Sequence, residues 1–166
     1  MTLKMNLLSV ALLASMSVAA MAPAAAAEAA APSADPYVAP KIKHEKYGDM
    51  KVVVPLTDPA LVGMKLRNIH NMLGALKTWG GKADIRVVMY AKGVAWLKNP
   101  DAKEKEMLDK LRGEGVRFEV CNNSLQEQNI NFHSLYGVLD ADIVPSGFAE
   151  VAFLQNRKHF AVEPAK

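Results

Sequence analysis

The sequence predicts an α/β domain built on a mostly parallel sheet of about five strands. Short apolar segments typical of strands alternate along the chain with longer segments of helical periodicity. This alternation favours a parallel sheet that helices cover on both faces, because crossovers between parallel strands usually contain a helix. In such sheets, sites form beyond the carboxyl ends of the strands.

Residues 1–27 are expected to be an export signal and not part of the fold. Lys4 supplies the positive start, Leu7–Met21 form the apolar centre, and Ala25–Ala27 offer the small residues that a signal peptidase requires. The alternative is an uncleaved anchor, because the apolar run approaches the roughly 20 residues that span a bilayer. Cleavage is favoured, since alanine is weakly apolar and Pro23 interrupts the run. We therefore expect a periplasmic protein with no membrane attachment after cleavage.

Residues 28–47 are predicted to be a flexible linker, because they are rich in Ala, Pro and Ser and show no periodicity. Residues 48–164 then have the length of one domain with one core. The formal net charge of the chain is +3 at pH 7, without a long basic run. This mild excess gives little support to nucleic-acid binding, so we expect no nucleic-acid partner.

The first strand is predicted at Met50–Pro55, which is nearly continuously apolar. Asp58 and Pro59 form an N-cap and first-turn pair that starts a long helix. Gly80–Gly81 ends this helix. Its buried stripe is expected to comprise Val62, Leu66, Ile69, Leu73 and Leu76.

The second strand is predicted at Ile85–Tyr90, followed by a short segment at Val94–Leu97. Asn99–Pro100 are expected to cap the next helix, Asp101–Arg112, whose Lys and Glu residues lie on a solvated face. Apolar residues then alternate with charged ones over residues 116–120, which predicts a third strand with one face more buried.

The remaining elements are shorter. Ser124 and Glu127 form a capping box that marks the start of a short helix. A second short helix is predicted near His133–Leu139, and a strand around Asp142–Val144. Pro145, Ser146 and Gly147 open a helix that runs to about Gln155, and Phe160–Val162 form the last strand.

Cys121 is the only cysteine of the chain and ends the third strand. It cannot form an intramolecular disulfide, so in an oxidising compartment it is buried, bridged to another chain or kept reduced for chemistry. A thiol just before a helix lies near unpaired N–H groups, which favour the reactive thiolate. Glu119 and Glu127 oppose this, because nearby carboxylates raise a thiol pKa. A reactive role and a packing role both remain open.

Six other residues are candidate binding residues at the same edge of the sheet. Asn122, Asn123 and Ser124 are either turn and capping residues or donors that hold a sulfur anion. Ser146 and Gly147 open a helix at a strand end, which is either an anion cradle or a simple turn. Lys92 follows the second strand and is either solvated or a positive charge near the thiol.

Other chemistries have no motif in the sequence. The four histidines lack ligand spacing, so we expect no metal site. His133 is close enough in sequence to assist Cys121 as a base, although a position on a helix surface is favoured. The sequence contains no CxxC pair, GxGxxG or phosphate loop, so a dithiol mechanism is excluded and no cofactor is expected.

Several segments resemble the motifs of DsrE/DsrF-like proteins. They are Gly115–Leu125, Ile143–Glu150 with Leu154–Gln155, Val88–Val94, and Leu66–Ile69 with Asn71. The resemblance covers about residues 50–164. It implies a three-layer α/β/α domain that usually forms homo-trimers or homo-hexamers.

In the relay members of that family, the matching cysteine carries a persulfide that passes between proteins, and Cys121 is the position that would inherit this role. Gln126–Asn129 are neutral or acidic where relay members often have basic residues, and the known relays lack a leader. One hypothesis is therefore a periplasmic sulfur carrier or sulfurtransferase-like protein. Its partner is a sulfur donor or acceptor protein or a small sulfane-sulfur compound.

The other hypothesis is a non-catalytic binding or assembly module, in which the oligomer matters and Cys121 is structural. The candidates for burial between subunits are aromatic residues, namely Phe132, Tyr136, Phe148 and Phe153.

Overall fold

The computed structural model describes residues 41, 42, 44 and 48–163. The fold presented below is that of residues 48–163. The expected export signal and nearly all of the expected linker lie outside the described residues. In the described part of the chain, the helices are too short or too polar to cross a membrane.

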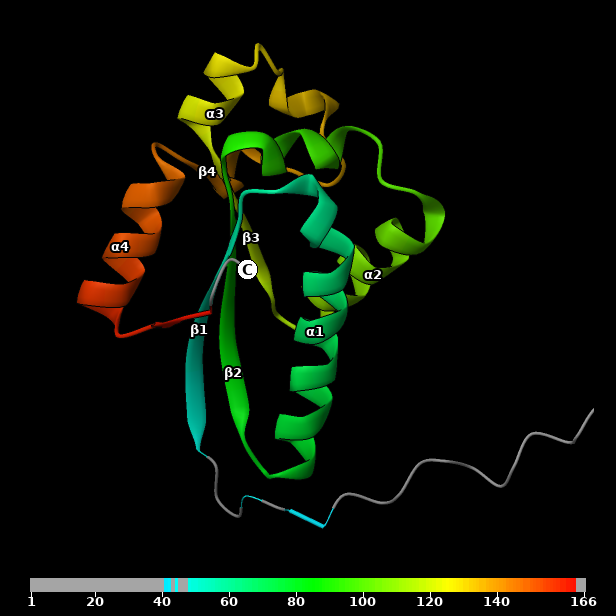
Figure 1. Cartoon of the computed structure of the whole chain (residues 1–166), viewed down its shortest axis with the longest axis vertical. Coiled ribbons are helices and arrows are strands. Elements are labelled where there is room, and N and C mark those ends of the chain that lie inside the picture. The colour runs from blue at the N-terminus through cyan, green and yellow to red at the C-terminus, as the bar shows by residue number, and fades with distance from the viewer. Residues whose placement is uncertain (1–40, 43, 45–47, 164–166) are drawn as a thin grey trace, which may run out of the picture. The chain divides into compact units, whose positions relative to one another are not determined.

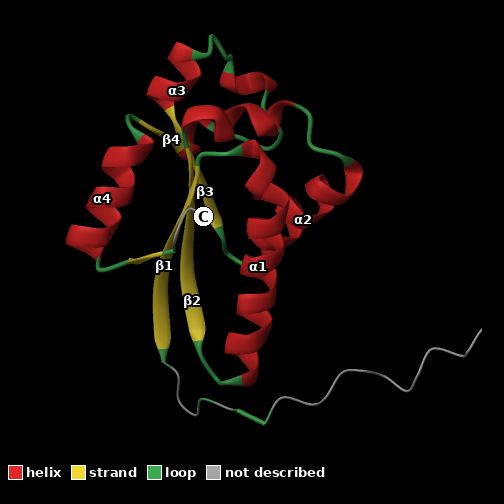
Figure 2. Cartoon of the chain, viewed as in Figure 1, coloured by secondary structure: helices red, strands yellow, loops and turns green. Residues whose placement is uncertain are grey.

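Five parallel strands form one sheet in the order β4-β3-β2-β1-β5, which confirms the predicted fold class (Figure 2). The strands are β1 (Asp49–Leu56), β2 (Lys82–Met89), β3 (Arg117–Cys121), β4 (Ile143–Val144) and β5 (Ala161–Val162). The α-helices are α1 (Pro59–Thr78), α2 (Ala102–Gly113), α3 (Asn122–Glu127) and α4 (Gly147–Lys158). Three 3₁₀ segments connect them, η1 (Ala91–Lys98), η2 (Phe132–Ser134) and η3 (Asp140–Asp142).

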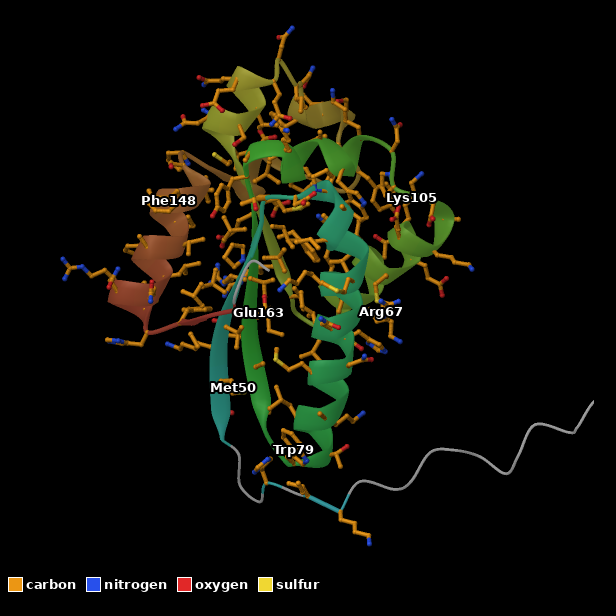
Figure 3. All side chains as sticks on the ribbon, in the orientation of Figure 1. Met50, Arg67, Trp79, Lys105, Phe148 and Glu163 are labelled. Atoms are coloured by element: carbon orange, nitrogen blue, oxygen red, sulfur yellow. The ribbon has the colours of Figure 1, made fainter. Side chains whose placement is uncertain are left out.

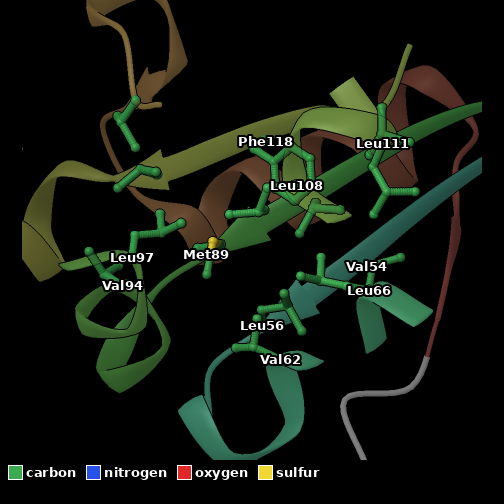
Figure 4. Packing of buried hydrophobic residues seen from close by; sticks show 14 of the residues in the cluster. Val54, Leu56, Val62, Leu66, Met89, Val94, Leu97, Leu108, Leu111 and Phe118 are labelled. Carbon is green, nitrogen blue, oxygen red and sulfur yellow. The ribbon is translucent and has the colours of Figure 1, made fainter. Parts of the chain in front are cut away.

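The helices cover the two faces of the sheet unequally. Helices α1 and α2 lie on one face and α4 lies on the other (Figure 1). The larger core fills the space under α1 and α2, where Leu56, Leu66 and Phe118 are buried together (Figure 4). The smaller core, on the α4 face, comprises Val53, Val88, Leu154 and Phe160. The three layers follow from strands that alternate between these two cores.

Helix α1 follows its sequence prediction closely. The Asp58 side chain caps it by accepting a hydrogen bond from the Ala60 N–H at 2.9 Å. Four residues of the predicted stripe are buried, and Leu73 is half-buried. Lys65 is also buried, and its ammonium pairs with the Glu163 carboxylate at 2.6 Å. This ion pair joins α1 to the residue that follows β5, a contact that helical periodicity alone does not predict.

Three local predictions are wrong. Helix α2 is capped by Asp101, not by Asn99–Pro100, because Asp101 and Glu104 exchange hydrogen bonds of 2.8 and 2.7 Å in a capping box. Helix α3 begins at Asn122 with Cys121 as its N-cap, so Ser124 does not cap it. The predicted helix at His133–Leu139 is replaced by η2, η3 and a turn at Gly137, whose φ of +66° interrupts a helix.

Candidate functional site

Cys121 lies at the carboxyl end of β3, where two strand-to-helix junctions meet. In the parallel register Cys121 pairs with Val144, the last residue of β4. Phe118 and Val120 belong to the larger core, so the alternation along β3 places Glu119 and Cys121 on the opposite, α4 face. The sulfur therefore faces the turn that leads into α4.

Four hydrogen-bond donors surround the Cys121 sulfur. The Ser124 N–H donates to Sγ with an N···S distance of 3.4 Å. The Ser124 hydroxyl and the backbone N–H groups of Asn123 and Gly147 are the other three, and each lowers the pKa of the thiol. The donors come from the first turns of both α3 and α4. These are the N–H groups that a helix start leaves without an intrahelical partner.

The two helix starts are held together by backbone contacts. The Asn123 N–H donates to the Pro145 carbonyl at 3.4 Å, which links the two junctions directly. Gly147 is buried, and a Cβ atom there would lie 2.7 Å from Tyr90 Cβ. Only glycine lets the start of α4 approach Tyr90 and Cys121 this closely. Gly147 is one of the candidate anion-cradle residues, and its backbone N–H is among the groups that lower the pKa of Cys121.

The hydrogen bonds change the acidity of the thiol. Burial raises the pKa of Cys121, but the hydroxyl and N–H donors of Ser124, Gly147 and Asn123 outweigh this effect. The net result is a pKa lowered from the ordinary value of 9.0. A lowered pKa increases the thiolate fraction at neutral pH, and the thiolate is the nucleophilic form.

Access to the sulfur is narrow. Cys121 exposes 4% of its surface, and Ser124 is equally buried. A pocket of about 300 Å³ adjoins α3, but Cys121 does not line it. Its walls include Leu125 and Ile130, which belong to the larger core, whereas the sulfur faces α4. The thiol therefore has hydrogen-bond donors from the protein around it and is poorly accessible to large reagents.

The predicted site residues divide into two groups. Asn123, Ser124 and Gly147 contact the sulfur, mainly through main-chain N–H groups and not through side-chain amides. Ser146 instead caps α4, where its hydroxyl accepts a hydrogen bond from the Ala149 N–H at 3.4 Å. Asn122 lines the pocket beside α3.

Two predicted helpers lie away from the thiol. Lys92 is exposed on η1 and is not among the groups that shift the pKa of Cys121. His133 is exposed on η2, where its ring lies 4.0 Å from the Phe132 ring. Within the part of the chain that the structure describes, no group of three or more His, Cys, Asp or Glu side chains could hold a metal ion.

Glu119 is a buried carboxyl that sequence reasoning considered only as a nearby charge. Its Oε1 accepts a hydrogen bond from Arg86 Nη1 at 2.7 Å, and its Oε2 is buried with no hydrogen-bond partner among the described residues. Burial raises the pKa of Glu119, the Glu150 carboxylate adds to this, and Arg86 and Arg117 oppose it. Period-two alternation placed Glu119 on the more exposed face, and helix α4 is what buries it.

Sequence reasoning missed the contribution of Ala91. Its N–H donates to Ser124 Oγ at 2.8 Å, and its φ is +48°. Neither the residue type nor the local pattern signals this backbone conformation, because residues other than Gly, Asn and Asp seldom adopt it.

Comparisons with known proteins give a family match and solved structures to which the chain is similar. The model of the DsrE/DsrF-like family matches residues 50–162. A solved protein of unknown function from Methanobacterium thermoautotrophicum, MTH1491, is 25% identical with a TM-score of 0.54, over 69% of this chain and 96% of that chain. Another solved protein of unknown function, BT1422 from Bacteroides thetaiotaomicron, is 14% identical with a TM-score of 0.49, over 68% and 91%. No curated protein matches the chain. Since the family model spans well over half of the sequence, the chain belongs to the DsrE/DsrF-like family.

Proposed function

We propose that this protein is an exported sulfur carrier in which Cys121 holds a persulfide. The observation that carries the proposal is the convergence of four hydrogen-bond donors on one sulfur, which lowers the pKa of the thiol despite its burial. Membership of the DsrE/DsrF-like family supports a role of the sulfur-relay type. No second thiol is needed, and the sequence contains none.

The chemistry consists of two thiol exchange steps. In loading, the Cys121 thiolate attacks the outer sulfur of a low-molecular-weight persulfide or polysulfide. A new S–S bond forms on Cys121, the donor's S–S bond breaks, and the donor leaves as a thiolate with the electron pair. In release, an acceptor thiolate attacks the outer sulfur and Cys121 leaves as a thiolate. The donor and acceptor together balance the reaction, so no separate oxidant is required.

The same donors serve both steps. Before loading, N–H groups of Asn123, Ser124 and Gly147 stabilise the attacking thiolate. During release they stabilise Cys121 as it departs, and a leaving thiol of lower pKa departs faster. The site therefore suits a carrier, which has to accept and surrender the same sulfur atom.

Burial suits a lone thiol in an oxidising compartment. With 4% of the residue exposed, Cys121 is shielded from large disulfide compounds, which would otherwise exchange with its thiolate to form mixed disulfides. Reaction with a macromolecular partner then requires the turn at Pro145–Gly147 to move aside. A small sulfane-sulfur compound needs a smaller opening, so we assign the loading step to such a donor.

Export and assembly complete the proposal. Export to the periplasm rests on the leader predicted for residues 1–27. Assembly into homo-trimers or homo-hexamers is supported by Phe148 and Phe153 of α4, which expose 74% and 47% of their surface. Figure 3 labels Phe148 on this helix. The other two candidates, Phe132 and Tyr136, pack against the larger core and offer less surface.

A second candidate function is a non-catalytic binding or assembly module. The observation in its favour is the burial of Cys121 together with the exposed aromatic residues of α4. In this alternative the sulfur serves only as the N-cap of α3, accepting the Ser124 N–H.

Loading with a small persulfide separates the two functions. Purified protein is incubated with cysteine persulfide, desalted and measured by intact mass, then mixed with an acceptor thiol and measured again. The carrier gains one sulfur atom and loses it to the acceptor, whereas the Cys121→Ser variant stays unchanged. Failure of the folded wild-type protein to gain a sulfur atom favours the assembly module.

A further inference from the structure

The residue that begins η1, Ala91, has an unusual backbone. Its φ of +48° lies in the left-handed region, which is unfavourable for an L-residue with a Cβ atom. The flanking residues leave it little freedom. The Tyr90 N–H donates to the Leu56 carbonyl at 3.1 Å, and a Cβ atom on Gly93 would lie 2.2 Å from that same oxygen. The start of η1 is therefore fixed against the end of β1.

Both polar groups of the Ala91 backbone are bound by side chains of the α3 segment. The Ala91 N–H donates to Ser124 Oγ at 2.8 Å. The Ala91 carbonyl accepts a hydrogen bond from Gln128 Nε2 at 2.7 Å, and that same nitrogen lies 3.0 Å from the Ser124 carbonyl. Gln128, the C-cap of α3, thus contacts both Ala91 and Ser124.

The contact with Ala91 determines how Ser124 uses its hydroxyl. A serine hydroxyl has one hydrogen to donate, and its oxygen accepts through the lone pairs. Because Ser124 Oγ accepts from Ala91, its hydrogen points away from Ala91 and is available to the Cys121 sulfur, whose pKa the Ser124 hydroxyl lowers. The hydrogen bonds form a continuous chain from Gln128 through Ala91 and Ser124 to Cys121.

We propose that Gln128 is a positioning residue for the Cys121 thiol, acting by holding Ala91 in the left-handed conformation so that Ala91 orients the Ser124 hydroxyl toward the sulfur. This inference rests on the proposed function, in which Cys121 reacts as a thiolate. It adds a residue that touches neither the sulfur nor any substrate. A backbone strained at such a position is typical of sites where geometry has to be fixed in advance.

The test replaces Gln128 with methionine, which is similar in length and helix propensity but has no amide donor. The matched control is Gln126→Met on the same helix, because Gln126 is exposed and lines the pocket beside α3. Thiolate formation is followed by ultraviolet absorbance against pH, with Cys121→Ser as the baseline. This readout needs neither a sulfur donor nor access to the thiol, so its result is independent of whether persulfide loading succeeds.

We expect Gln128→Met to move the thiolate titration to higher pH, and the Gln126→Met control to titrate like the wild type. In a Ser124→Ala background, Gln128→Met should cause little further shift, since the chain is already broken. Adding Ala91→Gly to Gln128→Met should restore part of the lost thiolate fraction, because glycine adopts positive φ without a hydrogen bond from Gln128 to hold it.

Circular dichroism melts identify which variants remain folded. A folded Gln128→Met protein with the wild-type titration would overturn the proposal. So would a shift of equal size with and without Ser124, because the effect would then bypass the hydroxyl. A shift that Ala91→Gly leaves untouched would likewise contradict control through the Ala91 backbone.

Discussion

The backbone N–H of Gly147 is one of the donors that lower the pKa of the Cys121 thiol, although the two residues lie at the starts of different helices, after different strands. The pairing of Cys121 with Val144 in the sheet brings these helix starts together. A parallel sheet places the carboxyl ends of neighbouring strands at one edge, so the N–H groups of two successive helices can serve one atom. The thiol is acidified by this arrangement and not by a charged neighbour.

Replacing Gly147 with alanine tests the close approach of α4. The added Cβ would lie 2.7 Å from Tyr90 Cβ, so the start of α4 has to shift away. We expect the free energy of unfolding to fall by about 1–3 kcal/mol, as for other overpacked sites. The pKa of Cys121 should rise as well, because the Gly147 N–H moves off the sulfur.

The control for that substitution is Gly74→Ala. Gly74 lies inside α1, and an added Cβ there would meet no atom within 4 Å. Alanine should stabilise this helix by roughly 0.5–1 kcal/mol and leave the thiol titration unchanged. Equal thiol titrations for both glycine variants would contradict the role given to α4. Denaturant unfolding and thiolate absorbance measure the two quantities.

Removing the Ser124 hydroxyl tests the other helix start. In Ser124→Ala the hydroxyl donor is lost, so the pKa of Cys121 should rise. It should stay below the ordinary value of a thiol without donors, because the backbone N–H of residue 124 still donates to the sulfur. Alkylation by a small reagent at near-neutral pH should slow accordingly. An unchanged alkylation profile with pH would show that the hydroxyl does not stabilise the thiolate.

The lowered pKa of Cys121 also predicts how stability depends on pH. Because the folded-state pKa lies below the ordinary 9.0, ionisation of Cys121 stabilises the fold above pH 9.0, and that stabilisation is lost as pH falls through the folded-state pKa. The wild type should therefore gain stability over Cys121→Ser as pH rises through this range. Chemical unfolding at several pH values measures the difference, and a constant difference would contradict the shift.

Glu119 predicts the opposite pH dependence at acidic pH. Its pKa is raised from 4.5 by burial, so the protonated form is favoured in the folded state. This contribution to stability is full below pH 4.5 and is lost as pH rises through the folded-state pKa. Relative to Glu119→Gln, the wild type should lose stability across that window. A difference that grows with pH instead would show that Arg86 dominates over burial.

The exposed aromatic residues of α4 predict an interface between copies of the chain. A double variant, Phe148→Ser with Phe153→Ser, should shift the protein from oligomer to monomer in light scattering. Leu139→Ser is the control, because Leu139 is 66% exposed but lies outside α4. An α4 interface would be excluded if the wild-type protein were a monomer. It would also be excluded if Leu139→Ser dissociated the oligomer and the double variant did not.

Local sequence signals predicted most of the fold. The N-cap Asp58 and the apolar stripe from Val62 to Leu76 predict one helix. The alternation that ends at Cys121 predicts one strand. These signals depend on residues near one another in the chain, so they can be recognised without knowing which elements pack against each other in the fold. They also placed the cysteine at the correct end of the sheet.

The rest depends on tertiary contacts that local patterns do not carry. Gly147 reaches Cys121 because β4 pairs with β3, and Glu119 is buried because α4 crosses above it. Ala91 has a positive φ at a point where the side chains of Ser124 and Gln128, distant in sequence, bind its backbone. The capping box predicted at Ser124 failed for the same reason, since the Ser124 hydroxyl is engaged by Ala91 and Cys121.

The most direct test of a persulfide on Cys121 is the intact mass of the protein taken straight from its native compartment, before and after reduction. We predict a population that is heavier by one sulfur atom. Reductant should remove this atom, and the Cys121→Ser variant should lack it. A single mass equal to the unmodified mature chain in both samples would contradict the assignment of Cys121 as a persulfide carrier.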